Sequence, residues 1–348
     1  MADYIKLVKS LEELTAFKAS NDFVTPNVTV IYGDTTIDYN PIHDYSQDYL
    51  TFVAKEDGTF KFSKNSVNYS LDNGETWTTL SSNTDTPTVQ AGNKIMFKAT
   101  LFPKKSIGIG TFSSTGKFTI QGNMMSLLYG DNFIGQKDLT GKDYTFYNLF
   151  SSCIGLTNAK NVCLPATTLA NQCYEYMFSG CTALTTAPKE LPATTLASNC
   201  YYYMFSGCTS LTNAPELPAT TLVSNCYYYM FRNCTSLTNA PELPATTLAY
   251  GCYQFMFYGC TSLTNAPELP ATTLASNCYS YMFNGCTSLT TAPELSATTL
   301  TTWCYERMFN GCTNLNYIKM LATDISATNC LNGWVVYQVL VHLLNIQI

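Results

Sequence analysis

CYYYMFSGCTSLTNAPELPATTLVSN, residues 200–225, recurs in near-copies before and after itself. A first series of cysteines marks the start of each copy every 26 residues: Cys200, Cys226, Cys252, Cys278, Cys304 and Cys330. A second series keeps the same interval: Cys208, Cys234, Cys260, Cys286 and Cys312. Repetition at a fixed period of 20–50 residues is typical of a solenoid, in which each coil buries its apolar face only against its neighbours. The sequence therefore predicts a stack of equivalent coils.

Composition excludes two classes of partner. The net charge is −6 and only 12% of the residues are charged, whereas nucleic-acid binding needs a basic stripe. No apolar run reaches the 18 residues of a membrane span, so membrane insertion is not expected. The start, MADYIKLVKSLEELTAF, lacks the apolar block of a secretory signal. We therefore expect the chain to stay in the producing cell or to leave by another route, such as release in a virus particle.

The cysteines are expected to pack rather than to react. All 15 lie at or after Cys153, and 14 belong to the two series once Cys153, Cys173 and Cys181 are included. Zinc is not expected, because the spacing within a repeat is Cys-x7-Cys and both histidines lie outside the repeats. Disulfides between coils are geometrically feasible. Buried, reduced thiols are favoured, since cysteine behaves as a small hydrophobe. No cofactor is expected.

Each coil is predicted to contain a short strand and a short helical turn. Residues 211–214 are the strand candidate, because Pro215 lacks an N–H and must end the ladder. A helix over about residues 224–232 would place Cys226 and Met230 on one inward face, and Gly207 fits the left-handed position that ends such a helix. We therefore expect an α/β solenoid preceded by a small all-β domain. The expected core side chains are Cys200, Met204, Phe205, Cys208, Leu211, Cys226, Met230, Cys234 and Leu237.

Five segments are predicted along the chain. Residues 1–46 are expected to form a helix, over 1 to about 22, and a β-hairpin turning at Gly33-Asp34; they are either an attachment segment or a plain N-terminal cap. Residues 47–130 alternate like a small β-sandwich. Residues 131–152 form a linker and the cap of the solenoid, and 153–334 are the repeats. Residues 335–348 are an apolar tail with none of the repeat signature.

The stretch SLDNGETW, residues 70–77, matches the Asp-box pattern of sialidases and other β-proteins. Its four pattern residues are Ser70, Asp72, Gly74 and Trp77. Physically the pattern is a hairpin turn in which Asp72 accepts backbone N–H bonds and Gly74 takes positive φ. A glycosidase needs two positioned carboxylates, which one such turn does not supply. We therefore interpret the segment as structural and do not expect an enzyme.

Positions that vary between copies are the candidates for ligand binding. They lie two and three residues after the first cysteine (for example Glu175/Tyr176 and Gln254/Phe255), just before that cysteine, and after Met-Phe. Tyr, Trp and Arg there are typical interface anchors. The alternative is that the tyrosines only stack on one another as a surface ladder. The candidate binding residues are Tyr202, Tyr203, Tyr228, Tyr229, Arg232, Tyr250, Tyr258, Tyr281, Trp303 and Arg307.

The pattern MF-x-G-C-T-S-L-T-x-A-P-x-L-P at period 26 resembles the BspA-type leucine-rich repeats of bacterial surface proteins. The resemblance covers about residues 147–334 and implies a leucine-rich-repeat solenoid with a non-catalytic adhesion or receptor-binding function. Here Ala-Pro-x-Leu-Pro replaces the family's shorter spacing between strand and proline. The N-terminal part, with FVTPNV, is similar to proteins encoded by phages of gut Bacteroides-type bacteria. That similarity implies that the protein is located in a phage virion, in the tail or fibre. The alternative location is a bacterial cell surface.

Two alternative functions are therefore expected, in this order of preference. The first is an adhesin that presents its tyrosine-rich repeats to a cell-surface glycan or protein and contacts other virion proteins through residues 1–46. The second is a purely structural rod without a specific ligand. The tail, VVYQVLVHLLNIQI, is either a hydrophobic C-terminal strand or cap, or the product of a frameshift.

Overall fold

The computed structural model describes residues 4–8, 28–32, 35–39, 43–103, 108–335 and 340–343. The chain divides into two compact units, Met1–Asp44 and Tyr45–Ile348. In the first unit β2 (Val28–Tyr32) pairs antiparallel with β3 (Thr35–Tyr39), with Tyr32 opposite Thr35, so the hairpin predicted around Gly33-Asp34 is present. The two turn residues themselves lie outside the described residues.

The helix predicted over residues 1 to about 22 is wrong at its start. Tyr4–Val8 is strand β1, which pairs in parallel with β2 from Tyr4 opposite Val28 to Val8 opposite Tyr32. Ile5 and Leu7 fit a strand period of two as well as a helical one, and the β-branched β2 supplies a ladder for them. The rest of the predicted helix lies outside the described residues.

The second unit begins with two β-sheets and three short helices. A six-stranded sheet has the order β11-β10-β4-β8-β6-β7, and a two-stranded sheet pairs β5 with β9. The strands of the larger sheet are β4 (Leu50–Ala54), β6 (Val67–Ser70), β7 (Thr78–Leu80), β8 (Lys94–Lys98), β10 (Phe118–Asn123) and β11 (Leu156–Cys163). The others are β5 (Phe60–Phe62), β9 (Phe112–Ser114), η1 (Tyr45–Gln47), α2 (Ser126–Tyr129) and η2 (Gly130–Asn132).

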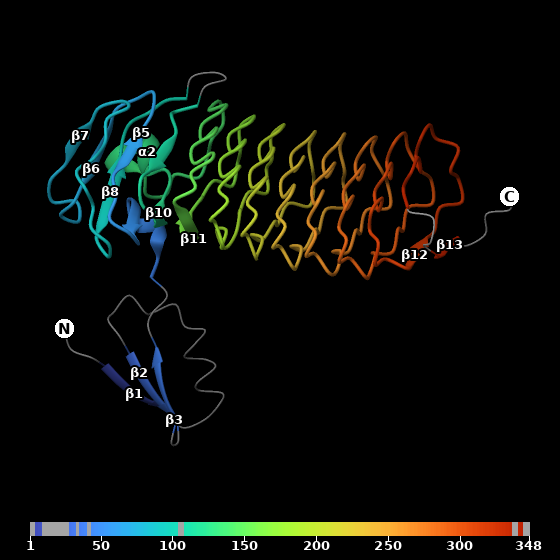
Figure 1. Cartoon of the computed structure of the whole chain (residues 1–348), viewed down its shortest axis with the longest axis horizontal. Helices are drawn as coiled ribbons and strands as arrows, with labels where there is room; N and C mark the ends of the chain where they lie inside the picture. Colours follow the sequence, from blue (N-terminus) through green and yellow to red (C-terminus); the bar gives the residue numbers. More distant parts are fainter. Residues whose placement is uncertain are drawn as a thin grey trace. The chain divides into compact units, whose positions relative to one another are not determined.

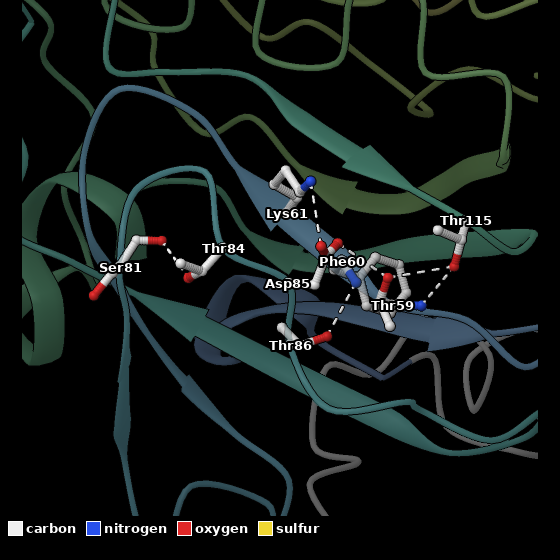
Figure 2. Close-up of polar contacts among 8 residues, drawn as sticks. All are labelled: Thr59, Phe60, Lys61, Ser81, Thr84, Asp85, Thr86 and Thr115. Carbon is white, nitrogen blue, oxygen red and sulfur yellow. Dashed lines mark hydrogen bonds and ion pairs between the residues drawn. The ribbon is translucent and has the colours of Figure 1, made fainter.

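The loop before β8 is fastened to β5 by side-chain hydrogen bonds (Figure 2). Thr86 Oγ1 accepts from the Phe60 N–H at 3.0 Å, and Asp85 pairs with Lys61 at 3.2 Å. Thr59 adds a bond from its hydroxyl to Asp85 at 3.1 Å. These contacts fix the loop along β5, and we assign them a structural role.

The β-sheets and the coils share one core, so the predicted boundary at 130 and the linker 131–152 do not separate two bodies. Phe52 contacts Phe112 of the smaller sheet at 4.9 Å between ring centroids and Phe150 of the supposed linker at 5.9 Å. Phe150 in turn stacks on Phe178 of the next coil at 5.5 Å. β11, the first strand of the repeats, pairs in parallel with β10. The sheet therefore continues directly into the solenoid.

The coils, stacked in one row in Figure 1, are not helical, contrary to the prediction. Successive backbone N–H groups bond alternately to a carbonyl of the same coil and to a carbonyl of the following coil. Tyr202 N and Met204 N each bond the carbonyl three residues earlier, at 3.2 Å, whereas Tyr201 N and Tyr203 N bond carbonyls of the following coil at 3.0 Å. An α-helix would direct every N–H to the carbonyl four residues earlier. Successive tight turns, tied to the neighbouring coil, therefore replace the predicted helix over 224–232.

Every fourth residue of this turn ribbon has positive φ, which also excludes a helix. In the coil that starts at Cys226 these residues are Asn225 (φ 54°), Tyr229 (φ 55°) and Asn233 (φ 57°). The left-handed residue predicted after Met-Phe is present, as at Gly207 with φ 75°. Glycine and asparagine suit this conformation because they pay little for it.

The predicted strand per coil is reduced, in most coils, to isolated parallel bridges such as Thr186 with Asn213 and Asn239 with Asn265. Two coils differ. β11 and β12 (Tyr317–Met320) are regular strands, and each has a lysine where the other coils have the proline of Ala-Pro. Since proline donates no N–H, it stops the ladder after about one pair.

The interior is built from columns of identical side chains. All nine predicted core residues are buried, most of them completely. Equivalent tyrosines stack with their rings nearly parallel, as Tyr201 does on Tyr227 at 5.6 Å and 2°. All fifteen cysteines are free thiols, and those of the second series donate to a phenylalanine carbonyl of the preceding coil, as Cys234 Sγ does to Phe205 O at 3.1 Å.

The apolar tail adds a strand to the last coil. β13 (Leu340–Leu343) pairs in parallel with β12, from Tyr317 opposite Leu340 to Met320 opposite Leu343. This arrangement fits the interpretation of the tail as a C-terminal strand; the frameshift hypothesis stays a prediction about the gene. No helix among the described residues is long and apolar enough to cross a bilayer.

Alkali should destabilise the solenoid. Burial raises the pKa of Cys208 and Cys260 from 9.0 to about 12, so these thiols favour the folded state below pH 9 and lose that contribution as pH rises toward 12. In this pH range, each of the two thiols lowers the free energy of unfolding by about 1.4 kcal/mol per pH unit. We expect the urea midpoint, measured in reductant, to fall above pH 9. It should fall less steeply in Cys208→Ser/Cys260→Ser, which keeps the donors without the titration; equal slopes would contradict the assignment.

Candidate functional site

The surface that varies most between coils carries a row of aromatic rings. We call it the aromatic ladder; its members occupy the third position after the first-series cysteine and are Tyr176, Tyr203, Tyr229, Phe255 and Tyr281. Successive rings stack at centroid distances of 5.0, 4.5, 4.3 and 4.5 Å, with interplanar angles of 13–26°. All five side chains are half-buried. The ladder is therefore ordered and accessible along its edge.

A second, shorter row lies beside the ladder. Tyr202 stacks on Tyr228 at 4.9 Å and 4°, and each also contacts the ladder ring next to it in sequence, at 4.6 Å. The structure thus brings together four of the predicted binding residues: Tyr202, Tyr203, Tyr228 and Tyr229.

The backbone of the ladder is strained. Its five aromatic residues have φ between 54° and 58°, and Arg307, which follows in the same column, has φ 47°. The flanking left-handed columns contain mostly glycine and asparagine, for example Asn199 and Gly207 around Tyr203. A bulky residue in this conformation is unusual, because its Cβ crowds the following carbonyl at a cost of about 1–2 kcal/mol. The coils thus keep aromatic side chains where glycine or asparagine would relieve the backbone.

Two arginines join the aromatic rings. The Arg232 guanidinium carbon lies 5.5 Å from the centre of the Tyr229 ring and 5.9 Å from that of Tyr258. Arg307 lies 5.6 Å from the centre of Tyr281, the last ring of the ladder. Both are within the range of a cation–π contact. The structure therefore gathers Arg232, Tyr258, Tyr281 and Arg307, all predicted binding residues, around the ladder.

Tyr250 and Trp303 are exposed aromatic residues of the predicted set, at 52% and 38%. They come just before the first-series cysteines of their coils, and Trp303 occupies a left-handed position (φ 54°) that is asparagine or glycine in most other coils. Among the described residues Trp303 makes no ring contact with another aromatic side chain. Unlike the rings of the ladder, its ring is therefore not stacked on an aromatic neighbour in the described part of the chain.

Comparison with known proteins decides the family of these coils. The model for the BspA type leucine-rich repeat region matches six copies, over residues 143–255 and 229–332. The matched stretch is more than half of the chain. The chain belongs to the BspA-type leucine-rich repeat family. Repeats of this family characterise proteins of the interaction or adhesion type. No curated protein and no solved structure was found to match.

Three members of the BspA-type repeat surface were not among the predicted site residues. Tyr176 extends the ladder beyond Tyr203, and Phe255 stacks between Tyr229 and Tyr281; only their position relative to the cysteine indicated this role. Glu175 is the third: its side chain is 7% exposed and accepts a 2.7 Å bond from Gln172. Burial raises its pKa to about 7 although that hydrogen bond acts in the opposite direction. This position is Tyr202 and Tyr228 in the next two coils and polar in the later ones, so the sequence gave no signal that Glu175 is buried.

The BspA-type surface offers hydrogen-bond donors and cation contacts. Burial and the neighbouring phenols raise the pKa of Tyr228 to about 12, so its hydroxyl stays a donor at neutral pH. The carboxyls of Glu175 and Glu306 belong to coils five repeats apart and cannot act as a glycosidase pair. Among the described residues, no group of three or more His, Cys, Asp or Glu side chains is arranged to hold a metal ion.

The predicted Asp-box residues form the turn between β6 and β7, far along the sheet from the coils' strand β11. Asp72 accepts from the Thr76 N–H at 2.9 Å and from the Ser70 hydroxyl at 2.6 Å, and Trp77 Nε1 donates to the Gly74 carbonyl at 3.1 Å. Gly74 has φ 90°. The Ser70 and Thr76 hydrogen bonds lower the pKa of Asp72 to about 2. Its carboxylate is thus engaged in holding the turn.

Removing the Asp72 carboxylate should loosen this turn. In Asp72→Ala we expect faster amide hydrogen exchange over residues 70–77 at pH 7, measured by mass spectrometry, because the Thr76 N–H loses its acceptor. Because the pKa of Asp72 is lowered from 3.8, the protection it gives is present above pH 3.8 and fades as the pH falls toward 2. Glu75→Ala removes the same charge nearby and should leave exchange unchanged; similar acceleration in both variants would contradict the assignment.

Proposed function

We propose that the protein is a non-catalytic receptor-binding protein whose aromatic ladder and its arginines contact a glycan or protein on a cell surface. One observation carries the proposal: five aromatic residues in successive coils occupy left-handed backbone positions that favour glycine or asparagine. Strain retained in an ordered structure is found mostly where a side chain serves a function. Tyr and Arg, which dominate this surface, give large contact area for little loss of entropy.

Magnitudes show what the ladder rings gain from packing. A left-handed bulky residue costs about 1–2 kcal/mol, and an aromatic pair contributes about 0.5–1.5 kcal/mol beyond its burial. These two terms nearly cancel, so an aromatic residue is favoured over asparagine at this position mainly by the apolar area that its half-buried ring removes from water. The exposed part of each ring adds nothing to this packing, and we propose that it contacts the ligand.

The alternative is a structural rod without a specific ligand. One observation favours it: each ladder ring lies against the rings of its neighbours at 4.3–5.0 Å, so its faces are not free to stack on a ligand. Under this alternative the ladder serves only to hold adjacent coils together.

The site of action is proposed from the resemblance of residues 1–46 and the β-rich part to phage-encoded proteins of gut Bacteroides-type bacteria. We place the protein in a phage tail or fibre, with residues 1–46 contacting other virion proteins. A bacterial cell surface is the second candidate. Immunogold labelling of purified particles with an antibody to the repeats distinguishes these locations.

Replacing three ladder rings by asparagine should separate the two functions. In Tyr203→Asn/Tyr229→Asn/Phe255→Asn, relief of backbone strain should offset the lost stacking, so we expect the melting temperature to change by only a few degrees. Binding of the full chain to a panel of fixed gut bacterial cells and immobilised glycans should fall at least tenfold.

The control carries the same substitution on another exposed row of the same coils, at Thr212, Thr238 and Thr264, and should bind like the parent. A large loss of thermal stability with unchanged binding in the ladder variant would favour the structural rod.

A further inference from the structure

The chain contains only two arginines, and both contact the aromatic ladder. Arg232 lies against Tyr229 and Tyr258, and Arg307 against Tyr281. The other 16 basic residues are lysines, and only Lys160, Lys189 and Lys319 belong to the repeats. Arginine is thus confined to the surface that we propose binds the receptor.

Neither arginine has an acidic partner among the described residues. Four lysines among the described residues of the same unit are paired with a carboxylate, for example Lys98 with Asp131 at 2.7 Å and Lys319 with Glu294 at 2.6 Å. Glu306, next to Arg307 in sequence, instead accepts a 3.1 Å bond from the Asn332 side-chain amide. The guanidinium groups are therefore held by aromatic rings with their N–H donors available.

We infer that the aromatic ladder binds an acidic polysaccharide, with Arg232 and Arg307 contacting its carboxylate or sulfate groups. This inference rests on the proposed receptor-binding function and names its ligand class. The planar guanidinium matches a carboxylate or sulfate with two parallel hydrogen bonds. The two arginines belong to coils three repeats apart, about 15 Å along the stack at about 4.8 Å per coil.

The regularity of the surface favours a polymer that repeats along its length. Five successive coils present a ring at the same position and a step of 4.3–5.0 Å, so a repeating ligand meets the same contacts from one of these coils to the next. The ladder exposes ring edges and phenolic hydroxyls, which suit the hydroxyl groups of sugars. The contacts that one polysaccharide chain makes with successive coils then add up to a higher overall affinity.

Other anionic partners fit less well. A single-stranded nucleic acid is bound by stacking its bases on free aromatic faces, whereas the rings of the ladder already stack on one another. An acidic peptide lacks the row of hydroxyls that the tyrosine edges match. A nucleic acid and an acidic peptide are therefore included as probes in the binding test.

The test measures binding of the full chain to polygalacturonate, which carries carboxylates, and to heparin, which carries sulfates, with dextran, poly-glutamate and single-stranded poly-dT beside them. We expect at least one of the two polysaccharides to bind and to bind more weakly at higher salt. Arg232→Gln and Arg307→Gln should each weaken binding about tenfold, the loss of one charged hydrogen-bonding group.

The matched control removes two positive charges from the same repeats without touching the ladder. Lys160→Gln/Lys189→Gln alters exposed lysines, one in β11 and one after Pro188, and should bind like the parent. Equal loss in the control, equal binding of poly-dT or poly-glutamate, or no binding of either polysaccharide overturns the inference. If dextran or cells still bind after both arginine substitutions, the inference is also overturned, but the proposed receptor-binding function is not.

Discussion

The alternation of backbone hydrogen bonds from coil to coil is the constraint on which the rest of the structure depends. In each turn ribbon one N–H closes a turn within the coil and the next reaches the neighbouring coil, as Tyr202 N and Tyr203 N do. Coils tied at every second residue must have equal length, and their side chains must fall in columns. The chain exceeds the 26-residue interval at two places: Cys173 to Cys200 is 27 residues, with the extra residue near Lys189, and Cys153 to Cys181 is 28, with the extra residues between Leu156 and Leu164. In both, the extra residues lie outside the turn ribbon.

Two consequences follow from these columns. Inward columns become dry stacks of cysteine, methionine, phenylalanine and tyrosine, in which thiols donate to carbonyls of the preceding coil. Outward columns place one side chain per coil at a fixed step, and one of them falls on a left-handed backbone position. Aromatic residues in that column strain the backbone, because their φ is positive. Stacking orders their rings, and the ring edges stay accessible. The same geometry that makes the core regular thus makes the surface a repeating array.

Much of this arrangement was predictable from the repeat itself. The period, the inward cysteines and the left-handed residue at Gly207 all follow from which positions stay constant between copies. The helix over 224–232 was not excluded by the sequence, since Cys226 and Met230 have helical spacing; bonds to the next coil, which no local pattern reveals, decided against it. Tyr4–Val8 became a strand for a similar reason, because β2 offered a partner. In the site, composition indicated tyrosine and arginine, but only the structure showed that rings stack face to face and that, among the residues it describes, Arg232 and Arg307 have no acidic partner.

Thiol labelling under native conditions tests the stacked-coil account most directly. The ten cysteines from Cys200 to Cys312 are fully buried, whereas Cys163 is partly exposed. With N-ethylmaleimide at pH 7.5 and mass-spectrometric readout, the account predicts that Cys163 is modified while those ten stay unmodified until the chain is unfolded. Modification of the ten at the rate of Cys163 would show that the coils do not share a dry interior, and would contradict the account.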